Sequence, residues 1–228
     1  MADRPILMSA PMVRATMREV EVPDTGKTNT RRIPRGEVLQ EEALPSEAQE
    51  NLDLRGWGRY PQADGSAVWV KVPWAVGDRA WVRETWAQHT RAEDRVYAKG
   101  DGHPWGSPIY RATFGAILAP ACEGFTPWRS PIHMPRWASR LTLMIEDVRV
   151  QRLQDISEED ARAEGSQEPT LRNLGGDLAQ AAMSERQVFS RLWDHIHGPG
   201  AWGQNPWIYA LTFRPVLANI DSLGAPDA

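Results

Sequence analysis

The sequence has one cysteine and no long hydrophobic run, and each scarcity excludes a class of protein. Cys122 has no second cysteine to pair with, so an internal disulfide is excluded and a reducing compartment is expected. No apolar stretch reaches the roughly 20 residues that span a bilayer. The opening residues, MADRPILMSAPMV, also lack the apolar core and cleavage site of a signal peptide. We therefore expect a cytoplasmic protein without membrane contacts.

The motifs of common catalytic and metal sites are also missing. The five histidines include no HxxxH pair, and the lone cysteine has no partner ligand, so no metal site is expected. The chain has no GxSxG, GxGxxG or Walker loop, which argues against a serine hydrolase, a dinucleotide enzyme and a P-loop enzyme. We expect no cofactor.

Lysine is scarce as well, and its few positions draw attention. Three of the 26 basic residues are lysines, and the other 23 are arginines. Only lysine readily loses its proton, so a lysine kept among arginines is a candidate for chemistry, and Lys27 is the one beside other polar residues. The net charge of −4 argues against broad binding of polyanions. Eleven tryptophans are expected mostly in the core, with a few as stacking platforms for bases.

The clearest local signals lie between residues 141 and 165. Alternating apolar residues predict a strand over 141–150, and the alternation slips at 146–147, which predicts a bulge. Ser157 stands three residues before an acidic side chain, the pattern of an N-cap. A short helix over 158–164 should follow and end at Gly165. A bent strand thus delivers a short acidic helix to a fixed place.

The remaining segments predict an α+β fold. The expected elements are a strand at 3–8, a helix from Ser9, strands at 68–72 and 79–86, a helix at 179–197 and a strand at 207–214. Residues 33–67 and 88–127 are expected to be long loop insertions, the first with a weak helix over 37–51 and the second with a hairpin between 96–97 and 109–110. Strands and helices do not alternate regularly, which favours one domain over 1–216 with a small mixed barrel, followed by a disordered tail at 217–228.

Two polar segments leave alternatives open. Arg83 and Glu84 are neighbours on a predicted strand, so at least one of them points inward and requires a partner. They form either an internal ion pair or part of a site. The segment 26–32, GKTNTRR, is either an ordinary basic turn in solvent or a group of residues that binds anions or performs chemistry.

Taken together, the segments GKTNTRR, GDRAWVRETW, VRVQRLQDISEEDARAEG and NPWIYALTF resemble the ASCH family of PUA-like barrels. The resemblance is closest to ASCH-type proteins common in phage and prophage genomes, and it spans most of the chain. It implies a PUA-like mixed β-barrel with flanking helices, a bacterial host cytoplasm, and a nucleoside or an RNA or DNA with a modified base as partner. The chain departs from the family at 19–25, which looks like an insertion, and at Gly26, where the family has arginine.

One branch of this family resembles small amidohydrolases that remove the acetyl group from N4-acetylcytidine. The resemblance implies Lys27 as proton acceptor, Thr30 as nucleophile and Glu164 as proton donor. A threonine hydroxyl is a poor nucleophile without a neighbouring base, and a lysine serves as that base only when it is buried. This hypothesis predicts that the three side chains converge in one cleft. In the alternative, Glu164 merely ends an acidic helix and Lys27 is a surface lysine.

The competing hypothesis is a non-catalytic module that binds RNA or a modified base. Arginines would contact phosphates and a tryptophan would stack on a base. The candidate binding residues are Arg31, Arg32, Arg83, Glu84, His133, Arg136, Trp137 and Asn205. Two of them have structural alternatives, because Trp137 is also a core candidate and Asn205 is also suited to satisfy backbone groups. A ribonuclease ranks below both hypotheses, since no histidine pair for acid–base cleavage is recognisable.

Overall fold

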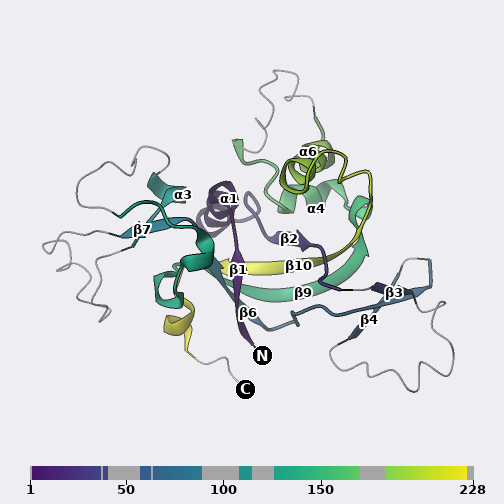
Figure 1. Cartoon of the computed structure of the whole chain (residues 1–228), viewed down its shortest axis with the longest axis horizontal. Coiled ribbons are helices and arrows are strands. Elements are labelled where there is room, and N and C mark those ends of the chain that lie inside the picture. Colours follow the sequence, from purple (N-terminus) through teal and green to yellow (C-terminus); the bar gives the residue numbers. More distant parts are fainter. Residues whose placement is uncertain are drawn as a thin grey trace, which may run out of the picture. The chain divides into compact units, whose positions relative to one another are not determined.

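The computed structural model describes residues 2–36, 38–40, 57–62, 64–88, 108–114, 126–169 and 183–224. It contains both helices and strands, as the predicted α+β class requires (Figure 1). The elements up to the middle of the chain are β1 (Asp3–Leu7), α1 (Ala10–Glu21), β2 (Asn29–Arg32), β3 (Val38–Gln40), β4 (Gly58–Pro61), β5 (Ala67–Val70), β6 (Arg79–Arg83), β7 (Trp86–Gln88), β8 (Pro108–Tyr110) and α3 (Arg111–Phe114). The later elements are η3 (Pro131–His133), η4 (Arg136–Ala138), β9 (Thr142–Arg152), η5 (Leu153–Asp155), α4 (Glu158–Ala163), α6 (Glu185–His197), β10 (Trp207–Val216) and η7 (Ile220–Leu223), where η marks a 3-10 helix.

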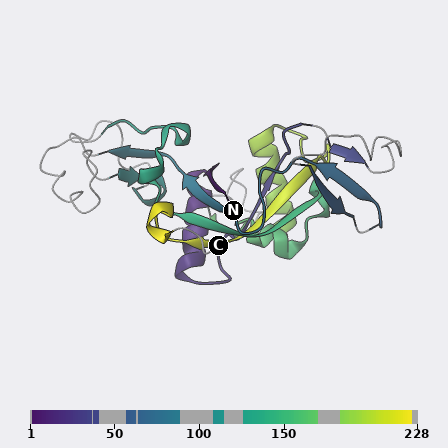
Figure 2. The ribbon, with the colours of Figure 1, turned by 90° about the horizontal axis from the view of Figure 1, so that it is seen from below.

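The largest sheet has five strands in the order β1-β6-β9-β10-β2. Strand β1 is parallel to β6, whereas β6 and β9, and β10 and β2, are antiparallel. The long strands β9 and β10 run side by side in it (Figure 2), and β10 contains the strand predicted at 207–214. In the described part of the chain the sheet is open, with β1 and β2 as its edges, so the predicted barrel stays a prediction.

The chain divides into two compact units. Unit one comprises residues 1–27, 79–144 and 215–228, and unit two comprises 28–78 and 145–214. Both β9 and β10 contribute residues to each unit. Because both units contain parts of the same two strands, the single domain over 1–216 stays a prediction.

The clearest predicted segment folds as expected. Strand β9 is continuous, with Thr142, Leu143 and Ile145 buried before the predicted slip and Val150 buried after it, and the bulge itself stays a prediction. The hydroxyl of Ser157 accepts a hydrogen bond from the backbone N–H of Asp160 at 3.0 Å and caps α4. Gly165, with φ at +88°, follows the helix. These signals are local, which is why the sequence reveals them.

Gly26 occupies a place in unit one that no other residue fits. A Cβ atom there would lie 2.3 Å from the backbone nitrogen of Glu19 and 2.4 Å from the carbonyl oxygen of Ala15, both in α1. The N–H of Gly26 also donates to Oε2 of Glu19 at 2.7 Å. The apparent insertion at 19–25 therefore extends α1 and folds back onto it, and this close approach explains glycine at position 26.

The two predicted loop insertions contain regular structure. Strands β3 and β4 both pair with β5 to form a three-stranded sheet, so 38–40 is a strand and not part of a weak helix. In the second insertion, β8 pairs with β7 and is followed by α3. The pairs β3–β5 and β7–β8 join segments 20 residues or more apart, which local periodicity does not reveal, whereas β4 and β5 pair across the short segment 62–66. The remainder of the predicted helix at 41–51 and the hairpin strand at 96–97 lie outside the described residues.

Three other expectations need correction. The segment predicted as one strand over 79–86 forms two strands: β6 ends at Arg83, β7 starts at Trp86, and residues 84–85 belong to neither. The helix predicted over 179–197 begins later within the described residues, since α6 starts at Glu185 with Ser184 as its N-cap. The chain at 217–224 is ordered, since Ile220 is fully buried in η7 and the side chain of Asn219 donates to three backbone carbonyls. Residues 225–228 lie outside the described chain.

Candidate functional site

Strand β2 carries polar side chains into the interior of unit two. Asn29, Thr30 and Arg31 are all buried, and β2 pairs with β10 in a regular antiparallel register. The interpretation of GKTNTRR as a basic turn in solvent is therefore wrong. Polar strand residues show no apolar alternation, so periodicity does not predict their burial.

The guanidinium group of Arg31 forms ion pairs with two carboxylates, that of Asp160 in α4 and that of Glu164, which caps the end of α4. Its Nη1 atom lies 3.0 Å from Oε1 of Glu164, and its Nη2 atom lies 2.6 Å from Oδ2 of Asp160. The side chain of Arg31 has no exposed surface. Because both donors are directed at carboxylates inside the protein, this geometry gives Arg31 a positioning role and not the phosphate contact expected from the sequence.

Asp160 is the residue that sequence reasoning missed. Its Oδ1 atom accepts hydrogen bonds from Nδ2 of Asn29 at 3.1 Å and from Nη2 of Arg149 at 3.2 Å, in addition to the contact of Oδ2 with Arg31. A carboxylate has about four acceptor sites, so these three donors leave one. The side chain of Asp160 is 18% exposed, so it reaches the surface of the cluster. Acidic residues are common in the first turn of any helix, which concealed this role.

We call Asn29, Arg31, Arg149, Asp160 and Glu164 the Arg31 cluster. Asn29 and Arg31 both contact Asp160, which places their side chains on one face of β2. Successive side chains of a strand point to opposite faces, so Thr30 projects from the other face. Strand β2 therefore does not direct the hydroxyl of Thr30 toward the carboxylates of α4.

Lys27 lies just before β2 and is buried. Its side chain is only 1% exposed, so the interpretation as a surface lysine is wrong. Its backbone N–H donates to the carbonyl of Ala15 at 3.0 Å within unit one. The next residue, Thr28, starts unit two and donates its N–H to the carbonyl of Ala163 at 2.9 Å. Thr30 and Glu164 belong to unit two, and the convergence of all three side chains in one cleft stays a prediction.

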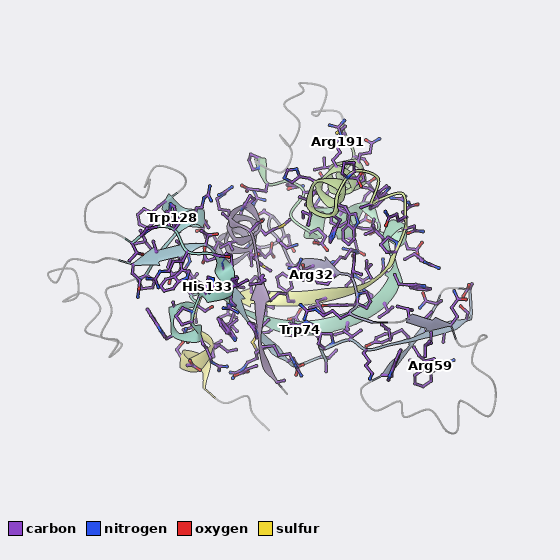
Figure 3. The ribbon with its side chains drawn as sticks, viewed as in Figure 1. Arg32, Arg59, Trp74, Trp128, His133 and Arg191 are labelled. Atoms are coloured by element: carbon purple, nitrogen blue, oxygen red, sulfur yellow. The ribbon has the colours of Figure 1, made fainter. Side chains whose placement is uncertain are left out.

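Arg32 is partly exposed at the end of β2 (Figure 3), and its contact with phosphate stays a prediction. Its positive charge influences His197 at the end of α6. Burial, followed by the charge of Arg32, lowers the pKa of His197 below its usual 6.5. The imidazole ring lies 4.2 Å from the ring of Trp193, measured between centroids.

In unit one, Glu84 is the inward-pointing member of the Arg83–Glu84 pair. Its carboxylate is buried and accepts from Nε and Nη2 of Arg140 at 2.9 and 3.1 Å. Burial raises the pKa of Glu84, and the hydrogen bond from Arg140 opposes this effect. The partner that burial requires is thus present. Arg83 lies 5.3 Å from the ring of Trp81 and donates to the carbonyl of Ile132.

The other predicted binding residues have mainly structural contacts. Nη2 of Arg136 lies 2.6 Å from Oδ2 of Asp3, and its Nε donates to Asp221. Trp137 packs edge-on against Trp86 at 6.1 Å, as a core residue does. His133 is exposed in η3 of unit one (Figure 3).

Asn205 orders the turn before β10 in unit two. Its Oδ1 atom accepts from the N–H of Gln154 at 2.8 Å, and its backbone has a positive φ of 44°. This is the backbone role foreseen for it, and it leaves the carbonyl of Asn205 as an acceptor for Arg152 at 3.3 Å.

Neither a metal site nor a membrane span is evident in the described ranges. Their histidine, cysteine, aspartate and glutamate side chains form no group of three able to hold a metal ion. Within the same ranges no helix combines the length and apolar character needed to cross a membrane. Comparisons with protein-family models, curated proteins and solved structures give no match. The resemblance to the ASCH family therefore stays a prediction.

Proposed function

We propose that the protein is a non-catalytic module that binds an unpaired or modified base of RNA or DNA, with the Arg31 cluster as its base-reading site. The observation that carries this proposal is the fixed, partly exposed carboxylate of Asp160, which three donors hold in place. A carboxylate accepts hydrogen bonds from exocyclic amines such as N4 of cytosine, whereas O4 of uracil offers only an acceptor. The site therefore favours an amine-bearing base.

The other parts of the proposal follow from the family resemblance. The resemblance implies that the chain is an ASCH protein, that its sheet closes into a PUA-like barrel and that it works in the cytoplasm of a bacterial host. A net charge of −4 restricts any contact with nucleic acid to a local site. Arg32 is partly exposed next to buried polar residues and supplies positive charge there, whereas the charge of Arg149 is paired with Asp147 and Asp160.

Binding of labelled oligonucleotides tests the proposal. The full chain is titrated with an oligocytidylate and an oligouridylate, each eight nucleotides long, at the same salt concentration. One well-placed hydrogen-bonding contact discriminates between bases by about 1–3 kcal/mol, so the cytidylate should bind about 5- to 150-fold more tightly. Equal affinity for both would refute base reading by Asp160, and absence of binding to either would refute the module.

Amide hydrolysis is a second candidate, favoured by the burial of Lys27 and Glu164. Lysine acts as a base only when its surroundings disfavour the charged form, and burial has that effect. The position of Thr30 on the opposite face of β2 argues against its role as nucleophile. Release of acetate from N4-acetylcytidine by wild-type protein, and its loss in Lys27→Ala, would support this candidate. A chain that releases no acetate is not this hydrolase.

A further inference from the structure

Two arginine–tryptophan pairs lie together in unit two, around the turn-rich loop that precedes β10. The Cζ atom of Arg152 lies 4.4 Å from the ring centroid of Trp207, and that of Arg186 lies 5.9 Å from the ring centroid of Trp202. Both tryptophans are only partly buried, and Arg186 is exposed. We call these four residues the Trp202–Trp207 surface.

Hydrogen bonds hold the parts of this surface in place. Nη2 of Arg186 donates to the carbonyl of Gln154 at 2.6 Å, and Nε2 of Gln154 donates to the carbonyl of Trp202 at 2.9 Å. Asn205 connects the same loop to Gln154 and Arg152 through the bonds described above. The aromatic rings and guanidinium groups are thus ordered before a ligand arrives, which reduces the entropy lost on binding.

Packing in the core of unit two links the Trp202–Trp207 surface to the Arg31 cluster, because the connecting residue Phe189 and Arg31 are both buried. The ring of Phe189 in α6 lies 5.9 Å from Cζ of Arg31 and 6.2 Å, edge-on, from the ring of Trp202. On the other side, Oε2 of Glu158 in α4 accepts from the backbone N–H of Arg186 at 3.1 Å. The elements that hold the proposed base-reading site therefore also hold the tryptophan surface.

From this arrangement we infer that the ligand is a single strand of nucleic acid, whose nucleotides next to the recognised base stack on Trp202 and Trp207. Every base has an aromatic face, so stacking accepts any sequence, and arginine beside the ring adds a phosphate contact. The carboxylate of Glu158 lies beside the backbone of Arg186 and adds a negative charge there, so the surface offers positive charge only at the guanidinium groups of Arg152 and Arg186. A short segment, not an extended strand, fits this charge pattern. The inference rests on the proposed function and specifies its substrate class.

The test compares free cytidine with eight-residue oligocytidylates of RNA and DNA, each titrated against the full chain. Trp207→Leu should weaken oligonucleotide binding about 5- to 150-fold, the usual loss for one stacked base, and leave cytidine affinity unchanged. Trp207→Phe keeps a stacking ring and should retain most of the affinity. Arg152→Gln should reduce the slope of log affinity against log salt by about 0.7, the value for one contact with a single-stranded phosphate.

The matched control is Arg191→Gln, which removes an exposed arginine of α6 (Figure 3) that is not part of the surface. Equal effects of Arg191→Gln and Arg152→Gln on the salt slope would overturn the inference. So would wild-type protein that binds cytidine as tightly as the oligonucleotides. If neither cytidine nor an oligonucleotide binds, the proposed function itself fails. Thermal unfolding of each variant verifies that it is folded.

Discussion

Replacing Arg31 with methionine is the sharpest test of the buried ionic cluster. The substitution keeps an unbranched side chain and removes the charge that joins Glu164 and Asp160. Removing one partner of a buried ion pair costs about 3–5 kcal/mol because the other charge stays buried without compensation. Asp160 retains Asn29 and Arg149 as donors, whereas Glu164 loses its 3.0 Å contact with Nη1 of Arg31 at a side chain that is only 4% exposed, where water does not replace that contact. We expect the free energy of unfolding to fall by about 3–5 kcal/mol.

A double-mutant cycle with Glu164→Gln separates this charge effect from lost packing. The glutamine carries no charge, so Arg31→Met should cost about 0.5–3 kcal/mol less in the Glu164→Gln background, the usual range of coupling between contacting residues. Urea unfolding followed by tryptophan fluorescence measures all four proteins. Arg31→Lys should not rescue stability, since an ammonium group does not provide the planar fork that spans two carboxylates. A cost below about 1 kcal/mol for Arg31→Met, within the range of an exposed pair, would refute the ionic cluster.

Other perturbations test separate parts of the structure. The hydrogen bond from Arg79 lowers the pKa of Asp3 below 3.8, so its stabilising effect is present above that pH and is lost as the pH falls through the folded-state pKa. Asp3→Asn should therefore lower the thermal midpoint at pH 7, with the difference from wild type shrinking below pH 3.8, and a pH-independent difference would contradict this. Gly26→Ala introduces a Cβ into the backbone of α1, and chemical denaturation should show a loss of about 1–3 kcal/mol or more. Proton NMR should show His197 titrating below 6.5, and Arg32→Gln should raise its pKa. Because the folded chain binds this proton less tightly than the unfolded chain, His197 should reduce stability as the pH falls below 6.5.

The parts of the fold that the sequence predicts are those with local causes. Alternation identifies β9, and a serine three residues before an acid identifies the start of α4. The pairing of β3 with β5 has no such signal, because it joins residues about 30 positions apart in the chain. The ordered segment at 219–224 was missed for the same reason, since the amide of Asn219 donates to carbonyls about 80 residues earlier.

The candidate site was predicted in its residues more than in its arrangement. Glu164 and the 26–32 segment were selected correctly as neighbours, because Arg31 contacts Glu164 and Thr28 contacts Ala163. Thr30 was selected by matching a motif, and a motif does not specify which face of a strand its members occupy. Asp160 was dismissed because an acid in the first helical turn has an ordinary explanation. Its role as an acceptor in the Arg31 cluster depends on Asn29 in β2 and Arg149 in β9, which are distant from α4 in the sequence or on another element.

The ordered segment around η7 determines when unit one can be completed during synthesis. Thr142 donates its hydroxyl proton to the carbonyl of Ala218, and Nη1 of Arg79 donates to the carbonyl of Gly224. Domains generally fold as units while the chain emerges, but unit one needs residues that are translated after all of unit two. The contacts of β6 and β9 with this segment therefore form only after β10 has been translated. A chain truncated before Ala218 would contain all of unit two and lack these contacts of unit one.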